Sequence, residues 1–191
     1  MNTHIAIFAS GSGTNAENII RYFSKSKSIE VSLVVSNRSD AYVLERARLL
    51  KVPELIITKK EFPESEYYVL TKLRDFHIDF IVLAGFLLQI PKYLIQAYPG
   101  AIINIHPALL PRFGGKGMYG DHVHKAVVEA GEKESGITIH YVNEHYDSGA
   151  IIHQEKCAVD PADTYEDVAR KVHRLEYEFY PRIIEDIVSR L

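Results

Sequence analysis

The chain of 191 residues has a single cysteine, Cys157, and almost no excess of charge of either sign. One cysteine cannot form an internal disulfide, which is typical of a protein from a reducing compartment. A formal net charge of −3 argues against a broad surface for nucleic acid or for a membrane, while leaving room for a local site that binds one anion. We therefore expect small-molecule partners, with no nucleic acid and no membrane.

Long hydrophobic runs are also missing. The longest uncharged apolar run, residues 80–88, is about half of the roughly 20 residues that a membrane-spanning helix needs. The apolar stretch at residues 5–9 is too short for a signal peptide. Repeats, low-complexity segments and linkers are absent from the sequence as well. We therefore expect a cytoplasmic protein in which residues 1–191 form a single domain, present as a monomer or a homodimer.

Short apolar runs alternate with amphipathic stretches, which is the sequence pattern of βαβ units. The first runs are continuously apolar, as in strands of a sheet that is covered on both faces. They lie at residues 5–8, 31–35, 55–57, 80–84 and 101–105. Residues 137–141 instead alternate between apolar and polar, and a second run follows at 150–159, which favours antiparallel or edge strands. The sequence thus predicts an α/β protein with a doubly wound, mostly parallel sheet and an antiparallel edge in the C-terminal half.

Apolar residues at helical spacing predict the helices between these strands. Three stripes lie within residues 16–23, 44–50 and 69–76, and a fourth comprises Val168, Val172, Leu175, Phe179, Ile183 and Ile187. Thr164 and Asp167 predict a capping box at the start of the last helix. Pro181 predicts a kink or a break within it. Residues 112–120, with four glycines between 114 and 120, predict a mobile flap.

The glycine-rich loop at residues 10–15 joins the first strand to the first helix. It lacks the lysine of a P-loop, and three interpretations stay open. The free N–H groups at the helix start could bind a phosphate. The loop could also bind a dinucleotide, with Arg38 meeting a 2′-phosphate. In the third interpretation Thr14 and Glu17 merely form a capping box, which would use the same N–H groups.

Nine histidines raise the question of a metal, and the spacing of His122 and His124 suits ligands on a strand. No cysteine pair or HExxH helix accompanies them. Asp121 resembles the N-cap of a helix over residues 123–129, which would place both histidines on a solvated first turn. A role of the pair in substrate binding or in the flap is the third option. We expect no metal.

Asn104 and His106 stand two residues apart at the end of an apolar run, so on a strand they face the same side. Pro107 ends the strand directly after the histidine. A turn-like stretch can bring Asp147 back beside them, and a carboxylate near an imidazole favours the imidazolium, which can donate a proton to an oxyanion. Asn104 adds a neutral donor. Since the motif contains no nucleophilic serine or cysteine, it suggests direct attack of one substrate on another; the alternative is a buried polar pair that stabilises a strand end.

Four segments, at residues 10–15, 83–86, 104–111 and 146–149, together resemble the formyltetrahydrofolate-dependent formyltransferase family. The segment Asn-x-His-Pro-x-x-Leu-Pro is shared across that family, and the first loop in a chain this short resembles the branch that formylates glycinamide ribonucleotide. The resemblance implies a Rossmann-like fold with a phosphate-binding half at about 1–100 and a catalytic, folate-binding half at about 101–191. It also implies formyl transfer from 10-formyltetrahydrofolate, used as a co-substrate and without a metal, to the amine of phosphoribosylglycinamide in purine synthesis.

The same resemblance assigns roles to individual positions. His106 is the proton donor, Asp147 its electrostatic partner, and Asn104 a contact of the formyl group. The ribonucleotide is implied to lie against Gly13, Thr14, Asn15 and Glu176, with His173 nearby. The folate is implied to lie against Leu87, Leu88, Gln89, Ile90, Asn104, Asn143 and Glu144.

Three features depart from the family pattern. Leu88 and Ser65 stand where arginines are common, so Lys59 or Lys60 could contact the folate tail instead. The flap is longer than the short proline-glycine version typical of the family. A formyltetrahydrofolate deformylase and an NADP-binding redox module are the alternative functions.

Overall fold

A seven-stranded sheet forms the centre of the protein, which a computed structural model describes over residues 2–190. The strands are β1 (Thr3–Phe8), β2 (Ile29–Ser36), β3 (Glu54–Ile56), β4 (Phe80–Leu83), β5 (Ile102–His106), β6 (Glu134–Tyr141) and β7 (Ile151–Ala158). Their order across the sheet is β3-β2-β1-β4-β5-β6-β7. The first five strands are mutually parallel, whereas β6 runs antiparallel to both β5 and β7. The predicted mostly parallel sheet with an antiparallel C-terminal edge is confirmed.

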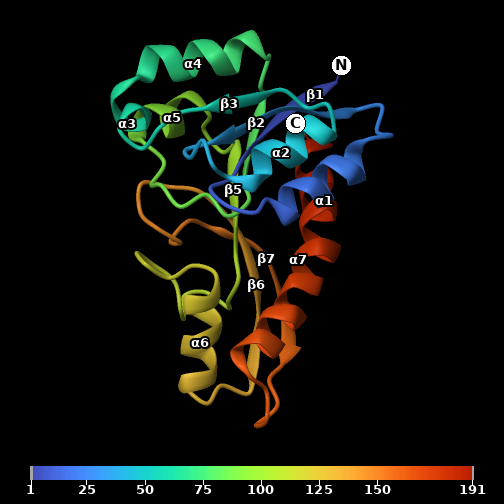
Figure 1. Cartoon of the computed structure of the whole chain (residues 1–191), viewed down its shortest axis with the longest axis vertical. Coiled ribbons are helices and arrows are strands. Elements are labelled where there is room, and N and C mark those ends of the chain that lie inside the picture. The colour runs from blue at the N-terminus through green and yellow to red at the C-terminus, as the bar shows by residue number, and fades with distance from the viewer. Residues whose placement is uncertain (1, 191) are drawn as a thin grey trace.

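Helices cover both faces of this sheet (Figure 1). They are α1 (Thr14–Phe23), α2 (Tyr42–Leu49), α3 (Glu61–Glu64), α4 (Glu66–Asp75), α5 (Lys92–Ala97), α6 (Asp121–Glu129) and α7 (Tyr165–Val188). Alternate residues of β1 belong to different cores: Ile5 and Ile7 pack with α1, α2 and α7, while Ala6 and Phe8 pack with α3, α4 and α5. Both sides of each central strand are therefore buried, which explains the continuously apolar runs.

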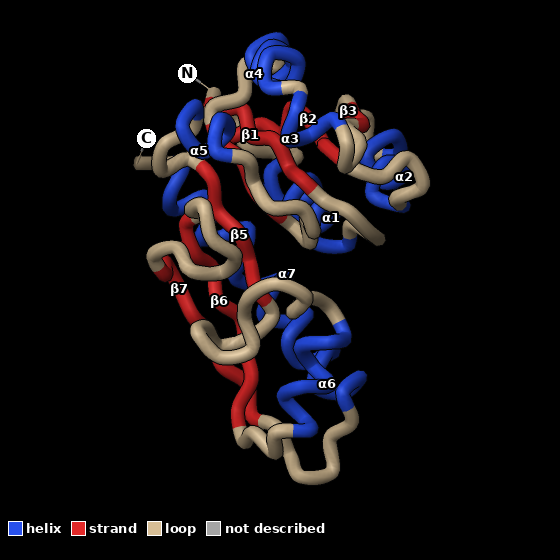
Figure 2. Tube along the Cα trace, turned by 90° about the vertical axis from the view of Figure 1, so that its left-hand side faces the viewer, coloured by secondary structure: helices blue, strands red, loops and turns tan. Residues whose placement is uncertain are grey.

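The antiparallel strands extend the sheet away from its parallel part. In Figure 2, β5, β6 and β7 run on towards the end of the molecule where α6 lies. Of these three strands only β7 lies at an edge of the sheet, because β6 pairs on both sides. The alternating pattern of β6 does not mark a solvent-exposed face, since the polar side chains of Thr138 and His140 are buried. Thr138 lies under the segment that follows β5, bonded to Ala108 and Leu110.

The predicted helical stripes are largely confirmed, with one correction in α7. All four residues of the α1 stripe are buried, and Leu44, Ala47, Val69 and Leu73 are buried in α2 and α4. In α7 the buried positions after Val172 are Glu176, Tyr180, Ile184 and Val188, together with Pro181. The predicted Leu175, Phe179, Ile183 and Ile187 are only partly buried. The apolar pattern does not include Glu176 and Tyr180, which face inward because their polar atoms have hydrogen-bond partners there.

Pro181 does not break α7, so that part of the prediction is wrong. A proline lacks the N–H that would bond the carbonyl four residues earlier. That carbonyl, of Tyr177, instead accepts a hydrogen bond from Asn18 Nδ2 of α1 at 2.9 Å. The capping box of Thr164 and Asp167 at the start of α7 is confirmed.

The start of α6 differs from its prediction. The helix begins at Asp121, with Gly120 as the N-cap and no capping hydrogen bond from a side chain. Asp121 is therefore not the N-cap. No helix within residues 2–190 is long and apolar enough to cross a membrane.

Candidate functional site

A cavity of about 600 Å³ lies where the strand order reverses between β1 and β4. In an open α/β sheet this reversal separates the loops at the carboxyl ends of neighbouring strands and leaves a crevice for ligands. The cavity walls come from residues 11–15 after β1, 84–88 after β4, 104–107 at the end of β5, 115–120 before α6, and 146–147, together with Lys59, His124, His173 and Glu176.

The loop after β1 presents an uncapped helix end to this cavity. Gly13 has φ 75° and packs against Val43, where an added Cβ would lie 2.4 Å from the valine Cγ2. No side chain caps α1, since Glu17 pairs with Arg21 and Arg46. The capping box of Thr14 and Glu17 is thus wrong, and the N–H groups of the first turn stay free of side-chain caps.

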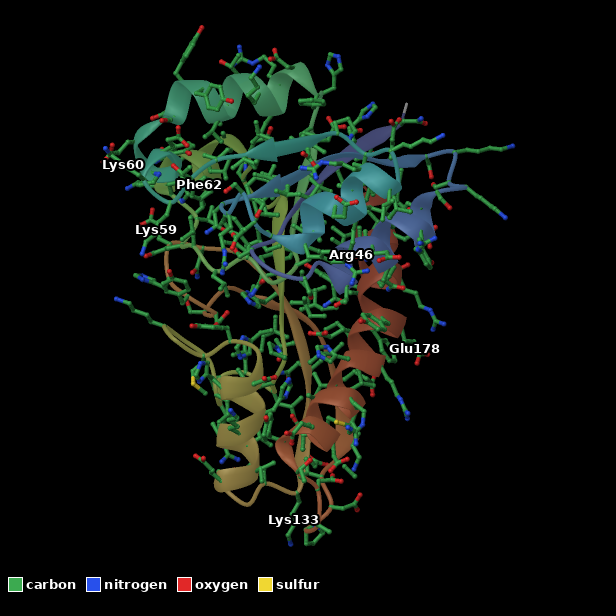
Figure 3. The ribbon with its side chains drawn as sticks, in the orientation of Figure 1. Arg46, Lys59, Lys60, Phe62, Lys133 and Glu178 are labelled. Atoms are coloured by element: carbon green, nitrogen blue, oxygen red, sulfur yellow. The ribbon has the colours of Figure 1, made fainter. Side chains whose placement is uncertain are left out.

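Arg46 also stabilises this loop, and its position on α2 beside α1 is visible in Figure 3. Its Nε donates to the carbonyl oxygen of Ser12 at 2.8 Å. The arginine therefore fixes the loop from behind by binding both Ser12 and Glu17.

The residues that a dinucleotide would need are engaged elsewhere. Asn37 accepts a hydrogen bond from the hydroxyl of Ser10, which in turn accepts one from the N–H of Leu87 at 2.9 Å. Arg38 pairs with Asp40 at 2.7 Å on the surface. Ser10 and Asn37 therefore tie the loops after β1, β2 and β4 together.

Asn104, His106 and Asp147 meet at the mouth of β5, as predicted. His106 Nδ1 lies 3.5 Å from Asp147 Oδ2. The Nε2 atom of the same ring lies 2.7 Å from the carbonyl oxygen of Phe113, so Nε2 is the protonated nitrogen that donates. Asn104 Nδ2 lies 3.4 Å from Asp147 Oδ1. All three side chains reach the cavity.

Burial and the neighbouring acceptors act in opposite directions on the pKa of this histidine. The His106 side chain is almost fully buried, and burial lowers its pKa more than Asp147 and the Phe113 carbonyl raise it. The predicted effect of Asp147 on this pKa is therefore present, but it is smaller than the effect of burial. Burial also acts to raise the pKa of Asp147, but the nearby imidazoles of His140 and His106 and the N–H of Gly115 outweigh it and hold that pKa low.

His140, which no sequence motif singles out, orients Asn104. Its Nδ1 donates to the carbonyl oxygen of Tyr141 at 2.9 Å. This leaves Nε2 as an acceptor, 3.1 Å from Asn104 Nδ2. His140 pairs with Asn104 across β5 and β6. The available signal was the alternation of polar residues at 138 and 140, which matches that of 104 and 106.

Thr138 is a second buried polar residue of β6 that no sequence motif singles out. Its hydroxyl donates to the carbonyl oxygen of Ala108 at 2.7 Å and accepts from the N–H of Leu110 at 3.0 Å. Gln154 Nε2 lies 2.8 Å from this hydroxyl and 3.0 Å from the Leu110 carbonyl oxygen. Thr138 and Gln154 thus fix the course of the chain directly after His106.

Two side chains of α7 reach the cavity opposite the motif. Glu176 is buried, and its Oε2 accepts from Asn15 Nδ2 at 3.0 Å and from His173 Nδ1 at 2.7 Å. The bond with Glu176 raises the pKa of His173 despite partial burial of the imidazole. The first loop and the last helix, which lie 161 positions apart in sequence, thus form one wall.

The residues expected around the folate divide between two cavities. Leu87 and Leu88 line the main cavity. Leu88, Gln89, Ile90 and Asn143 line a smaller one of about 60 Å³, which shares Asn104 and Asp147 with the first. Glu144 lies outside both, where its carbonyl oxygen accepts from Gln89 Nε2 at 2.7 Å.

The two lysines that could replace the missing arginines differ in position. Lys59 lines the main cavity, whereas Lys60 and Ser65 lie outside it. Figure 3 shows Lys60 beside α3 at the outer margin of the molecule, with Lys59 below it.

His122 and His124 do not act as a pair. His122 is exposed at the start of α6, as the solvated-turn interpretation predicts, while His124 is 1% exposed and lines the cavity. Within residues 2–190 no group of three or more His, Cys, Asp or Glu side chains is arranged to hold a metal.

Known proteins are similar to this chain in both sequence and fold. The family model described as formyl transferase matches residues 3–184. A phosphoribosylglycinamide formyltransferase of Bacillus subtilis is 37% identical over 188 residues, covering 96% of this chain and 94% of the relative. The crystal structure of a phosphoribosylglycinamide formyltransferase from Bacillus halodurans is 38% identical with a TM-score of 0.88, covering 98% and 96% of the two chains.

Plant relatives are longer than this chain. A chloroplastic phosphoribosylglycinamide formyltransferase of Arabidopsis thaliana is 43% identical over 185 residues, which cover 94% of this chain. The chain spans about three fifths of the length of the plant relatives that it matches, 63% of this one and 59% of that from Vigna unguiculata.

Proposed function

The chain belongs to the formyl transferase family, and we propose that it formylates glycinamide ribonucleotide. The donor is 10-formyltetrahydrofolate and the acceptor is the primary amine of 5-phosphoribosylglycinamide, a step of de novo purine (IMP) biosynthesis. One observation carries the proposal: Asn104, His106 and Asp147 share a cavity with an uncapped helix start. This combination suits a transfer reaction whose acceptor bears a phosphate.

The acceptor binds between α1 and α7 in this proposal. Gly13, Thr14 and Asn15 bind its phosphate through the N–H groups at the helix start, where the helix dipole favours an anion. Glu176, which is buried and aligned by Asn15 and His173, contacts the ribose. The amine then points away from the phosphate, towards β5.

The donor binds against the loop after β4. Leu87, Leu88, Gln89 and Ile90 form one side of its pocket, and Asn143 and Glu144 belong to the loop on the other side. Asn104 lies on the wall common to both cavities, which is where the formyl group has to lie to meet both substrates. Lys59 is the cation that takes the folate tail, because it lines the main cavity.

The chemistry is direct transfer. The amine nitrogen attacks the formyl carbon, and the resulting oxyanion accepts hydrogen bonds from Asn104 and from the Nε2–H of His106, which leaves the Phe113 carbonyl. A donor of this kind is worth about 3 kcal/mol in the transition state. The bond to N10 then breaks, the attacking nitrogen loses one proton and N10 gains one. Asp147, beside Nδ1, favours the protonated imidazole that donates to the oxyanion, and no metal takes part.

Three broader expectations belong to the same proposal. Residues 1–191 act as a single formyltransferase domain, on small-molecule substrates only, and the protein is a monomer or a homodimer. A cytoplasmic location stays a prediction, since two plant relatives are named as chloroplastic.

The experiment is an assay of tetrahydrofolate release by purified protein given 10-formyltetrahydrofolate, with and without glycinamide ribonucleotide. We expect turnover only when the ribonucleotide is present. Equal turnover without it would identify a deformylase. Absence of turnover combined with NADP binding would identify a redox module.

A further inference from the structure

His124 is a buried histidine that the proposed chemistry does not use. It lies in the first turn of α6, directly after the glycine-rich flap, and is 1% exposed. Its Nδ1 atom is buried without a hydrogen-bond partner. Unpaired buried polar atoms destabilise a folded protein, so an atom of this kind needs a structural or functional explanation.

The surroundings of His124 place it on the acceptor side of the cavity. The ring lines the cavity together with His106, His173 and Glu176. Its centroid lies 6.2 Å from that of His173, which binds Glu176 at 2.7 Å. An acceptor that extends from α1 to His106 therefore has to pass His124.

The surroundings of His124 favour its neutral imidazole. Burial lowers its pKa, and the neighbouring His173 lowers it further, against the smaller opposing effects of Glu176 and Asp121. A neutral imidazole has one nitrogen that donates and one that accepts. His124 can thus accept a hydrogen bond without adding a negative charge to the site.

This neutrality matters for an amine that has to attack. A carboxylate beside the amine favours the ammonium form, which has no lone pair for the formyl carbon. A neutral acceptor can bind an amine N–H and orient the lone pair with less of that effect. Ribose hydroxyls, in contrast, are better served by the carboxylate of Glu176, since hydrogen bonds to ionised acceptors are stronger.

We propose that His124 accepts a hydrogen bond from the attacking amine of the acceptor and directs its lone pair to the formyl carbon. The inference rests on the proposed function. It adds to the site a substrate-contacting residue, supplied by α6, that holds the reactive end of the acceptor while α1 holds the phosphate.

Steady-state kinetics of His124→Phe test the inference. The phenyl ring keeps the shape and removes both nitrogens, so kcat/KM for glycinamide ribonucleotide should fall 10- to 100-fold while KM for 10-formyltetrahydrofolate changes less than twofold. His124→Asn and His124→Gln place an amide near Nδ1 and Nε2 respectively, and one of them should recover part of the loss. His122→Phe, on the exposed neighbouring position, is the matched control and should behave as wild type.

Calorimetry with ribose 5-phosphate separates an amine contact from a hydroxyl contact, since this probe has the phosphate and hydroxyls but no amine. We expect wild type and His124→Phe to bind it equally. Weaker binding by the variant would overturn the amine contact in favour of a hydroxyl contact. Unchanged kcat/KM in a folded His124→Phe with a raised melting temperature would show a merely structural histidine. If wild type does not turn over glycinamide ribonucleotide at all, the proposed function fails and the inference falls with it.

Discussion

The Nε2 atom of His106 lies 2.7 Å from the carbonyl oxygen of Phe113. Two residues later, the N–H of Gly115 donates to Asp147 Oδ2 at 2.9 Å. The segment after β5 therefore contacts both members of the His106–Asp147 pair, and it uses the N–H that the proposed reaction needs. Movement of this segment away from His106 would therefore free the Nε2–H for the oxyanion.

His106→Ala should lower kcat by about 10² to 10⁴, which is the usual contribution of a positioned acid or base. KM for glycinamide ribonucleotide should change only a few-fold, since Asn15 and Glu176 do not contact His106 through any hydrogen bond. Steady-state assays of tetrahydrofolate release measure both constants. Wild-type turnover in a correctly folded variant would contradict the assigned role.

Asp147→Asn should lower the pKa of His106 further, because it removes the carboxylate that partly offsets burial. NMR titration of the His106 ring proton measures this directly. Between the folded pKa and about 6.5 the unfolded chain binds more protons than the folded one, so stability rises with pH there. The contribution of neutral His106 is therefore complete above about pH 6.5 and is lost as the pH falls through this window. An unchanged or higher pKa in Asp147→Asn would show that the carboxylate does not act on the imidazole.

Gly13→Ala should destabilise the protein by at least about 1 kcal/mol, since a Cβ in the left-handed region is strained. The same Cβ would also lie within 2.8 Å of three atoms of Val43. Urea unfolding measures the loss. Gly11→Ala is the matched control, because its Cβ would meet no atom within 4 Å, and its stability should stay within about 0.5 kcal/mol of wild type. Equal losses in the two variants would refute the steric argument.

Thr138→Val should reduce the free energy of unfolding by about 1 to 3 kcal/mol, because the buried polar groups of Ala108, Leu110 and Gln154 lose a partner. It should also lower kcat, since the chain after His106 loses its anchor. Thr138→Ser keeps the hydroxyl and should retain most of both properties. If the serine variant loses as much as the valine variant, packing of the methyl group is the cause.

Lys59→Ala should raise KM for a polyglutamylated 10-formyltetrahydrofolate by a few-fold, as expected when an exposed ion pair worth up to about 1 kcal/mol is lost. The effect should shrink at high salt. Lys60→Ala is the matched control, because Lys60 lies outside the cavity. A larger increase of this KM in Lys60→Ala would show that Lys60, and not Lys59, contacts the folate tail.

Much of the fold can be predicted from local sequence. The apolar runs predict the parallel strands because each is buried on both faces, as the two cores around β1 show. Asn104 and His106 face one cavity because strand geometry directs residues two apart to the same side. In both cases the outcome depends on nearest neighbours along the chain, which the sequence displays.

The rest depends on distant contacts. The lowered pKa of His106 results from its burial beneath a segment whose course no local pattern reveals. Glu17 could have capped α1, but Arg46 from the next helix binds it instead. Glu176 and Tyr180 look like surface residues until their partners, Asn15 and the Leu83 carbonyl oxygen, are known.

The hydroxyl of Tyr180 donates to the carbonyl oxygen of Leu83 at 2.8 Å, one turn beyond Glu176 on the same face of α7. Leu83 ends β4, so this bond fixes α7 to the strand that begins the donor pocket. Each residue inserted into an α-helix rotates the remainder of the helix by about 100° and shifts it by about 1.5 Å. An insertion between Glu176 and Tyr180 would therefore turn one of them out of place. The number of residues between Glu176 and Tyr180 is therefore constrained by two walls of the site at once.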